Sequence, residues 1–334
     1  MFICQIIASR GNGGLEKHVR DLSSCLFAQG HRVLVIADIK FLMTLPDGIE
    51  KQSLNMRLNR RNPWLLLQLY LKLRRYKFDV IHAQADKAAS MLCSIKVLLK
   101  TPTVATVHNI KSHFKLYQRL SHVICVSRHL ATQVNTSGAE VIYNGIQPMQ
   151  SKRLDLKAQY QLPDNKPVIC AVGRLVPAKG FDVLLQAING LDVSLIIAGE
   201  GPQSAELKNS IAHMQANTHV RLIGYYENPS DLMTSADGVV ISSRREGFSY
   251  VFNEALMCGA NILSTDVPVA NEVLPSALIV PINDVTLLRQ KLIALLQAPS
   301  HWGALMKEVQ QFAQQEMTLA QMTEKTIHLY QRMQ

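Results

Sequence analysis

The sequence contains no uninterrupted apolar run of the ~20 residues that a membrane-spanning helix requires, so it predicts no membrane span. Its six cysteines are scattered and form no Cys-x-x-Cys pair, which argues against a disulfide framework or a zinc site and is typical of reduced thiols. No basic segment precedes the short apolar stretch at the start, so we expect no secretory signal. Together these absences predict a cytoplasmic location.

Acidic residues are scarce in the first half of the chain. Residues 1–150 contain 20 Lys and Arg against 8 Asp and Glu, whereas the other residues contain 15 against 17. The basic clusters at 57–61 and 72–77 are either solvated helix faces or a surface for an anionic partner. An apolar helix candidate at 62–77, with Trp64 at one end and basic residues at the other, favours lipid headgroups over nucleic acid. An ordinary buried helix would have the same pattern.

Short β-rich runs alternate with helical segments along the whole chain, which predicts parallel sheets covered by helices. About six such runs precede residue 147 and six follow residue 166. The polar, proline-containing stretch between them has no core strand. We therefore expect an α/β protein of two doubly wound domains that face a central cleft, the first at 1–147 and the second at 148–315.

The first glycine loop fits a dinucleotide fingerprint only in part. Gly11 and Gly13 occupy the first two glycine positions and Asp38 supplies an acid, but Glu16 stands where the third glycine belongs. A large, negative side chain there opposes close packing and a nearby pyrophosphate, and no Walker loop occurs anywhere in the chain. The loop is therefore either an ordinary strand-to-helix turn or a flexible loop that approaches a different ligand.

Two cations lie between a strand and the next helix in the second half. Arg174 offers a planar fork to phosphate oxygens and Lys179 a compact charge, and a helix that starts near Gly180 adds its dipole. They are either a diphosphate clamp or two solvated cations. A cation at a helix N-terminus is disfavoured without an anion, which favours the clamp.

Two carboxylates follow, with seven residues between them. Glu246 precedes Gly247 and Phe248, whose backbone N–H groups are expected to be free at the start of a helix, and Glu254 lies about one turn into that helix. Such acids suit sugar or ribose hydroxyls. They would equally be placed by a favourable interaction with the helix dipole, worth about 0.3–1 kcal/mol each.

Several short motifs, in this order and at this spacing, resemble those of the retaining glycosyltransferases of family 4, which have the GT-B fold. They are GGLEKHV (13–19), TVHN (106–109), VSR (126–128), YNGI (143–146), VGRLVPAKG (172–180), IAGEGP (197–202) and EGFSYVFNEALMCG (246–259). The resemblance implies two Rossmann-like domains, of which the second holds a nucleotide-sugar. It also implies that a C-terminal helix, about 316–334, packs back on the first domain.

The resemblance also implies a role for each candidate residue. Arg174 and Lys179 would neutralise the diphosphate, Glu254 would hold the ribose, and Glu246 would hold the donor sugar. The other implied contacts are the Gly247 and Phe248 amides on the same sugar, His108 reaching it from the first domain, and Gly13 and Gly14 bordering the diphosphate and the acceptor. A lone histidine after an apolar strand is also often a core residue, although the strand's carboxyl end favours a site.

The chemistry implied by the family needs no cofactor and no metal, and the sequence lacks the Asp-x-Asp pair of metal-dependent GT-A enzymes. We expect transfer of a hexose or N-acetylhexosamine, with UDP as the nucleotide, to a glycan or glycolipid such as a lipopolysaccharide core or a lipid-linked polysaccharide precursor, with retention of configuration. The basic first domain would contact the cytoplasmic face of an anionic inner membrane and no nucleic acid.

One motif departs from the family pattern, because the stretch 265–275 lacks a glycine pair before Glu272, a loop that normally lies by the donor. Two alternatives stay open. A GT-B nucleotide-sugar epimerase would use a similar cleft but would not need a basic domain. A non-catalytic protein that binds membranes or nucleic acid would account for the charge but not for the clamp.

Overall fold

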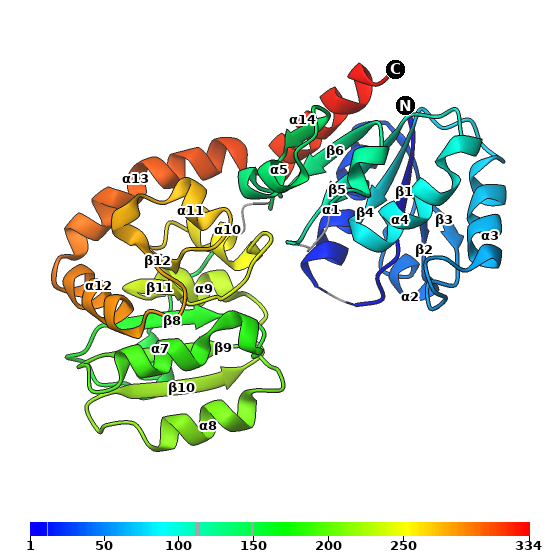
Figure 1. Ribbon diagram of the computed structural model, residues 1–334. Coiled ribbons are helices and arrows are strands. Elements are labelled where there is room, and N and C mark those ends of the chain that lie inside the picture. Colours follow the sequence, from blue (N-terminus) through cyan, green and yellow to red (C-terminus); the bar gives the residue numbers. More distant parts are fainter. Residues whose placement is uncertain (12, 111–113, 148–149) are drawn as a thin grey trace. The chain divides into compact units, whose positions relative to one another are not determined.

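The computed structural model describes residues 1–334 except 12, 111–113 and 148–149. It consists of two compact units, each an α/β sandwich around one parallel sheet (Figure 1). Unit 1 contains Met1–Gly145 and Glu316–Gln334, and unit 2 contains Ile146–Gln315. The sequence places the boundary after Gln147, next to residues 148 and 149, which lie outside the described part. The expectation of two parallel-sheet, Rossmann-like domains is confirmed.

The sheet of unit 1 has five inner strands that are almost wholly buried and two partly exposed edge strands, β3 (Glu50–Ser53) and β7 (Ala139–Val141). The inner strands are β1 (Phe2–Ile7), β2 (Arg32–Ala37), β4 (Val80–Gln84), β5 (Thr103–Val107) and β6 (His122–Cys125). All pairs are parallel, in the order β3-β2-β1-β4-β5-β6-β7. The expectation of six strands is wrong by one. β3 has the sequence EKQS, and an edge strand without apolar residues gives no pattern to detect.

Helices cover both faces of this sheet. They are α1 (Gly14–Ala28), α2 (Ile39–Leu42), α3 (Pro63–Leu73), α4 (Ala85–Ile95), α5 (Arg128–Val134) and α14 (Leu319–Arg332), with 3₁₀ turns η1 (Lys96–Leu98) and η2 (Tyr117–Arg119). α3 combines both predicted characters: Leu65, Leu69 and Leu73 are buried, whereas Trp64 and Leu67 are exposed.

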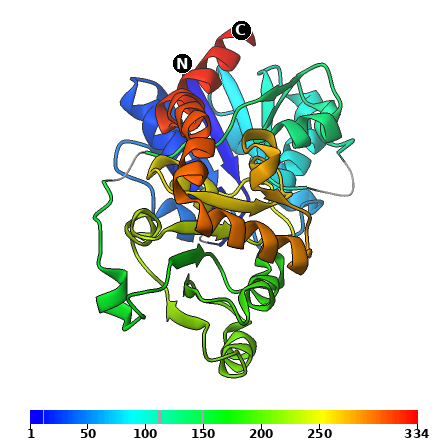
Figure 2. The same cartoon turned by 90° about the vertical axis from the view of Figure 1, so that its left-hand side faces the viewer.

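The last helix of the chain belongs to unit 1. α14 packs against α1, and the red C-terminal helix lies beside the blue N-terminal segment in both views (Figures 1 and 2). Its side chains Met322, Leu329 and Tyr330 join the core formed by α1 and the strands. The core of unit 1 is therefore closed by residues from both ends of the chain.

Unit 2 has a six-stranded sheet, with order β10-β9-β8-β11-β12-β13 and every pair parallel. Its strands are β8 (Val168–Val172), β9 (Ser194–Ala198), β10 (His219–Gly224), β11 (Gly238–Ile241), β12 (Ile262–Thr265) and β13 (Ile279–Val280). Its helices are α6 (Leu156–Tyr160), α7 (Phe181–Ile188), α8 (Ser204–Ala212), α9 (Pro229–Ser235), α10 (Tyr250–Met257), α11 (Ala270–Val273), α12 (Val285–Gln297) and α13 (Pro299–Glu316), with 3₁₀ turns η3 (Pro177–Lys179) and η4 (Ser276–Leu278).

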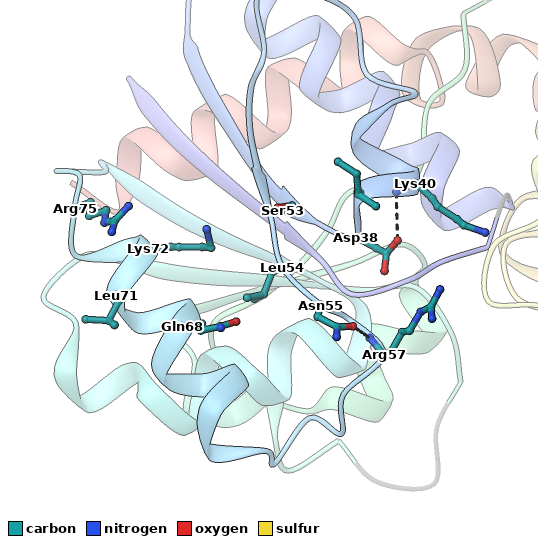
Figure 3. Close-up of a pocket in the computed structure, with 11 residues that line it drawn as sticks. Asp38, Lys40, Ser53, Leu54, Asn55, Arg57, Gln68, Leu71, Lys72 and Arg75 are labelled. Carbon is teal, nitrogen blue, oxygen red and sulfur yellow. Dashed lines mark hydrogen bonds between the residues drawn. The ribbon is translucent and has the colours of Figure 1, made fainter.

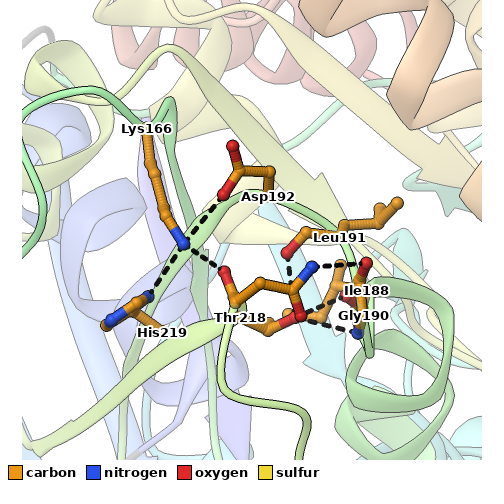
Figure 4. Close-up of polar contacts among 8 residues, drawn as sticks. Lys166, Ile188, Gly190, Leu191, Asp192, Thr218 and His219 are labelled. Atoms are coloured by element: carbon orange, nitrogen blue, oxygen red, sulfur yellow. Dashed lines mark hydrogen bonds and ion pairs between the residues drawn. The ribbon is translucent and has the colours of Figure 1, made fainter.

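A polar network fixes the amino ends of three neighbouring strands of unit 2 (Figure 4). Lys166, just before β8, contacts Asp192 at 2.8 Å and His219 at 3.4 Å. The Thr218 hydroxyl donates to backbone carbonyls of the turn before β9 and accepts from the Gly190 N–H at 2.9 Å. These contacts join elements that precede the strands, whereas the ligand edge of such a sheet is the carboxyl edge. We therefore assign the network a structural role.

Candidate functional site

The candidate residues of unit 2 lie where its sheet changes direction. β8 is central, and the chain proceeds to β9 and β10 on one side before it returns to β11 on the other. The loops after β8 and β11 therefore diverge at the carboxyl edge, which is the usual ligand site of an open α/β sheet. The first loop contains Arg174 and Lys179, and the second contains Glu246.

The structure brings Lys179 and Glu246 together. The Lys179 ammonium lies 2.5 Å from Glu246 Oε1, and the Ser243 hydroxyl donates to the same oxygen at 2.7 Å. The Glu246 side chain is only 9% exposed, so Lys179 compensates most of the cost of burying its charge. Lys179 therefore needs no anionic ligand to neutralise its charge at the helix N-terminus, because Glu246 supplies the anion.

Arg174 is exposed on the same loop. Its guanidinium makes no hydrogen bond or ion pair with the described part of the chain, and its carbonyl accepts from the Val176 N–H at 2.8 Å. The N–H donors of an exposed guanidinium are available to bind an anionic ligand from solution. Arg174 and Lys179 thus differ: one is solvated and the other is held by a protein carboxylate.

Glycines allow the loops at this edge to approach one another. Gly180 has φ +64°, and a Cβ on it would lie 2.1 Å from the Ser242 carbonyl oxygen. A Cβ on Gly199, after β9, would lie 1.9 Å from the Gly173 carbonyl oxygen. Neither contact is possible for a larger residue, so these glycines are required by close backbone packing. Gly180 lets the loop with Lys179 pack against the loop with Glu246, and Gly199 lets the loop after β9 pack against the start of the loop with Lys179.

Helix α10 begins at Tyr250, after the turn that contains Glu246, close to the start that the sequence predicts. Ser249 is its N-cap and accepts from the Phe252 N–H at 3.3 Å. Gly247 is buried and Phe248 half-buried in the turn before it. Glu254 lies half-buried one turn into the helix. Glu246, Gly247, Phe248 and Glu254 are therefore gathered around one helix N-terminus.

Sequence reasoning missed a second ion pair that shapes this loop. Arg244 contacts Asp182, in the first turn of α7, through two nitrogens at 2.8 and 2.6 Å, and it also donates to the Pro177 carbonyl at 2.8 Å. The Arg244 hydrogen bond lowers the pKa of Asp182. The pair clamps the turn that precedes Lys179. An acid in the first turn of a helix was a detectable signal for Asp182, but its partner, 62 residues away, was not.

The loop that lacks the family's glycine pair carries backbone strain. Val269 is buried and has φ +72°, although β-branched residues rarely adopt positive φ. It directly precedes α11, which contains Glu272. The positive φ of Val269 therefore lies in the same loop that lacks the glycine pair of the family pattern.

In unit 1, Gly13 and Gly14 are exposed at the start of α1, and Asn12 lies outside the described residues. The buried Glu16 side chain accepts from the Gly13 N–H at 2.8 Å. Glu16 is thus a capping residue for this helix, which explains an acid at the third position of the apparent fingerprint. It also occupies an amide that a dinucleotide phosphate would need.

His108 follows β5 at the carboxyl edge of the same sheet and is 7% exposed. Its Nε2 lies 2.9 Å from Gln84 Oε1, and its ring packs edge-on against His18, with 4.7 Å between centroids. Burial holds the pKa of His108 well below its usual range, and the nearby His18 and His82 act in the same direction. His108 is therefore a neutral imidazole near pH 7.

A cavity of about 320 Å³ opens beside His108 in unit 1. It lies at the carboxyl ends of β1, β4 and β5, where the order of this sheet reverses between β1 and β4. Its wall includes Gln84, Asp86, Lys87, His108 and Asn109. Polar groups of both signs could bind a sugar there.

A second, basic cavity of about 610 Å³ lies between α2, β3 and α3 in unit 1 (Figure 3). Lys40, Arg57, Lys72 and Arg75 line it, with Asp38 as its acid. Asp38 accepts from the Lys40 N–H at 3.2 Å and pairs with Arg10 at 3.3 Å, so its charge is already compensated. The cavity therefore has a net positive potential.

None of the helices formed by the described residues combines the length and apolar character that crossing a bilayer requires. Nor does the described part of the chain gather three or more His, Cys, Asp or Glu side chains into a group that could hold a metal ion.

Sequence models of two known families match this chain. The model described as "Glycosyl transferases group 1" matches residues 152–319, and the one described as "Glycosyltransferase Family 4" matches residues 12–150. The motif resemblance noted in the sequence is thereby confirmed over both units.

Individual relatives agree with this assignment. One subunit of human phosphatidylinositol N-acetylglucosaminyltransferase is 29% identical over 307 residues, which are 80% of this chain and 62% of the human one. The lipopolysaccharide core biosynthesis glycosyltransferase LpsE of Rhizobium meliloti is 26% identical over 223 residues, or 65% of this chain and 63% of its own. This chain thus spans less than two thirds of each. Anabaena HepE, solved in complex with UDP, has a TM-score of 0.86 at 20% identity over 99% of this chain and 100% of its own, and shares the fold.

Proposed function

We propose a function from the premise that this chain belongs to the group 1 glycosyl transferases, whose sequence model matches residues 152–319. On that premise it is a glycosyltransferase that moves a sugar from a nucleotide-sugar to a glycan or glycolipid. The observation that carries the proposal is the Lys179–Glu246 pair at the point where β8 and β11 diverge. It joins a phosphate-binding cation to a hydroxyl-binding carboxylate at the expected ligand edge.

The donor is a UDP-sugar in this proposal, with a hexose or N-acetylhexosamine as the sugar. HepE was solved with UDP, and the human relative is named as an N-acetylglucosaminyltransferase. Arg174 and Lys179 bind the diphosphate, Glu254 binds the ribose, and Glu246 binds sugar hydroxyls with the Gly247 and Phe248 amides. In unit 1 we assign Gly13 and Gly14 to the diphosphate and the acceptor, and neutral His108 to the donor sugar.

The charges of these residues suggest how transfer proceeds. When the bond between the anomeric carbon and the phosphate oxygen breaks, its electron pair goes to the leaving diphosphate. Arg174, Lys179 and the N-terminus of α10 then stabilise that charge without a metal ion. The acceptor hydroxyl forms the new bond to the anomeric carbon and gives its proton to the leaving phosphate. Attack from the same face retains the anomeric configuration.

The acceptor in this proposal is an anionic glycolipid on the cytoplasmic face of a membrane, such as a lipopolysaccharide core or a lipid-linked polysaccharide precursor. The basic cavity of unit 1 (Figure 3) supports an anionic group, and Trp64 and Leu67 of α3 are exposed. An aromatic and an aliphatic side chain beside cations is the composition of an interfacial membrane contact. The name of the Rhizobium relative supports a lipopolysaccharide acceptor.

Calorimetry with UDP, GDP, ADP and CMP, with NAD as a control and EDTA present, tests the donor proposal. We expect metal-independent binding of UDP to the protein, and a Glu254→Ala variant with a clearly weaker affinity because a ribose contact is lost. Binding of NAD alone, or of no diphosphate, would contradict the transferase assignment. Unchanged affinity in the variant would contradict only the ribose role.

Flotation with anionic vesicles tests the membrane contact. We expect the protein to float with phosphatidylglycerol vesicles at low salt and a Lys72→Glu/Arg75→Glu variant to stay in solution. Lys208→Glu, on the exposed face of α8 in unit 2, is a control for a charge reversal away from this surface and should float normally. Equal flotation of all three proteins would contradict the assigned surface.

A further inference from the structure

A line of buried polar side chains crosses the core of unit 1 and ends at His108. We propose that Gln84 is a positioning residue: it fixes His108 as the tautomer with the proton on Nε2, so that the Nδ1 lone pair is left to accept a hydrogen bond from substrate. The substrate part of this inference rests on the proposed function, whereas the tautomer does not. We call the side chains of Gln5, His82, Gln84, Thr106, His108 and Tyr330 the core network.

The first half of the core network is set by amide chemistry. Gln84 Nε2 donates to Gln5 Oε1 at 2.8 Å, so the carbonyl oxygen of Gln84 is the atom that faces His108. A carbonyl oxygen only accepts, and it lies 2.9 Å from His108 Nε2. The proton of His108 must therefore be on Nε2.

The second half continues in the same direction. Gln5 Nε2 donates to the Tyr330 hydroxyl at 3.2 Å, and that hydroxyl lies 2.6 Å from His82 Nδ1. Because the hydroxyl accepts from Gln5, it has its own proton for His82 Nδ1. His82 then carries its proton on Nε2, which lies 2.7 Å from Thr106 Oγ1. Along the line, His108 is the first donor and Thr106 the last acceptor, and each member between them donates once and accepts once. Gln84 Nε2 also lies 3.4 and 3.3 Å from the two ring nitrogens of His82.

Burial keeps every member of the core network uncharged. Desolvation lowers the pKa of His82 to about 3 and raises the pKa of Tyr330, while the pKa of His108 is lowered well below its usual range. No member gains or loses a proton near pH 7, so the direction of the hydrogen bonds is stable there. A neutral network of this kind orients its end group without contributing charge.

The tautomer decides what His108 can do. With Nε2 committed to Gln84, only the Nδ1 lone pair is available, and a lone pair accepts from a hydroxyl but repels a phosphate oxygen. His108 therefore selects a sugar hydroxyl over the diphosphate. Reversing every donor and acceptor would give the one opposite arrangement, in which both His82 and His108 carry their protons on Nδ1 and His108 becomes a donor. The protonated nitrogen of either histidine therefore shows in which direction the hydrogen bonds of the core network run.

Nitrogen NMR of the full chain with ¹⁵N-histidine reads the tautomers directly, because protonated and unprotonated ring nitrogens resonate far apart. A His108→Gln spectrum assigns the signal. We expect Nε2 to be protonated and Nδ1 unprotonated in His108 and His82 at pH 7. Gln84→Leu should release His108 into a mixture of tautomers. Thr326→Val, which removes a buried hydroxyl from α14 outside the core network, is the control. A proton on His108 Nδ1 in the unaltered protein overturns the inference.

Kinetics separate positioning from simple packing. Gln84→Glu keeps an acceptor beside His108 but adds a negative charge, which raises the pKa of the imidazole and should create an acidic limb in the pH profile of kcat. Gln84→Leu should lower kcat about 10²-fold at every pH, with unchanged UDP affinity. The titratable groups around His108 are His18 from α1, His82 from β4, and Asp86, Lys87 and Tyr117 in the cavity wall.

These outcomes distinguish the inference from the proposed function. An inactive protein with His108 protonated on Nε2 contradicts the transferase proposal and leaves the positioning role supported. An active protein whose Gln84→Glu variant has an unchanged pH profile, with His108 still protonated on Nε2, contradicts the substrate contact through His108. Full activity in Gln84→Leu overturns the positioning role.

Discussion

At the scale of single residues, Lys179 and Glu246 neutralise each other's charge. A carboxylate that is 9% exposed needs a counter-charge, and the ammonium 2.5 Å away provides it without a ligand. In the proposed function, a diphosphate competes with Glu246 for Lys179 and releases the carboxylate toward sugar hydroxyls. The ion pair holds both side chains in place without a ligand.

This pairing leads to the first prediction. We expect Lys179→Ala and Glu246→Ala each to lower kcat at least 10²-fold, the scale of losing a positioned electrostatic contact. Steady-state assays with a UDP-sugar measure the effect, and Glu308→Ala, an exposed acid on α13, should be indistinguishable from the unaltered protein. Near-normal turnover in either variant would remove that residue from the site.

Local sequence patterns predict the candidate residues but not the residues that contact them. Strand ends and glycine turns place Lys179, Glu246 and His108 at carboxyl edges, because a run of β-branched residues followed by glycine is readable over a few positions. The Lys179–Glu246 contact joins residues 67 apart and the His82–Tyr330 contact residues 248 apart. Such contacts depend on sheet order and helix docking, which no local pattern encodes.

At the scale of elements, the turns at the carboxyl edge of unit 2 are packed backbone to backbone. We expect Gly180→Ala to destabilise this unit and to weaken UDP binding at least tenfold, since its Cβ would lie 2.1 Å from the Ser242 carbonyl oxygen. Gly259→Ala is a matched control: its φ is also positive, +75°, but no atom lies within 4 Å of its Cβ. In both variants the new alanine must adopt a positive φ, which costs about 1 kcal/mol. Urea unfolding and calorimetry on both variants therefore show how much of the effect of Gly180→Ala comes from the steric clash.

The strands differ in how visible they are in the sequence. Central strands such as β1 and β9 are buried and mostly apolar because helices cover both faces of a parallel sheet. β3 lies at the edge and alternates half-buried and exposed polar residues. It pairs with β2 through backbone hydrogen bonds and the Arg32–Glu50 ion pair, and neither leaves an apolar pattern, so composition predicts a loop where the structure has a strand.

At the scale of the whole molecule, unit 1 contains a buried group of histidines that makes it sensitive to acid. Burial lowers the pKa of His18 to about 4, although a hydrogen bond between His18 and Asn144 acts to raise it, and burial lowers the pKa of His82 to about 3. The unfolded chain protonates these side chains near pH 6.5, before the folded chain does, so stability is complete above that pH and falls below it.

We therefore expect the free energy of unfolding of unit 1 to fall between pH 6.5 and 4 by up to ~1.4 kcal/mol per pH unit for each such histidine. Urea titrations at several pH values measure the slope. His82→Gln should flatten it. A stability that is constant from pH 7 to 4.5 would contradict the neutral, buried state of these residues.

The core of unit 1 depends on a helix from the far end of the chain. Deleting residues 319–334 removes Met322, Leu329 and Tyr330, and each large buried side chain is worth about 2–5 kcal/mol against a total of roughly 5–15 kcal/mol. We expect calorimetry to show that the unfolding transition of unit 1 is lost while unit 2 still unfolds cooperatively and binds UDP. Two intact transitions would contradict this dependence.

The position of α14 also sets the order in which the molecule can be made. The ribosome delivers unit 1 first, yet the helix that closes its core comes only after residues 146–315 have been translated, on the order of ten seconds later. Unit 2 has all its strands together and can fold during that interval. Unit 1 is thus synthesised before unit 2 but completed after it. Until α14 is made, the surface of α1 that α14 covers is exposed and available to a chaperone.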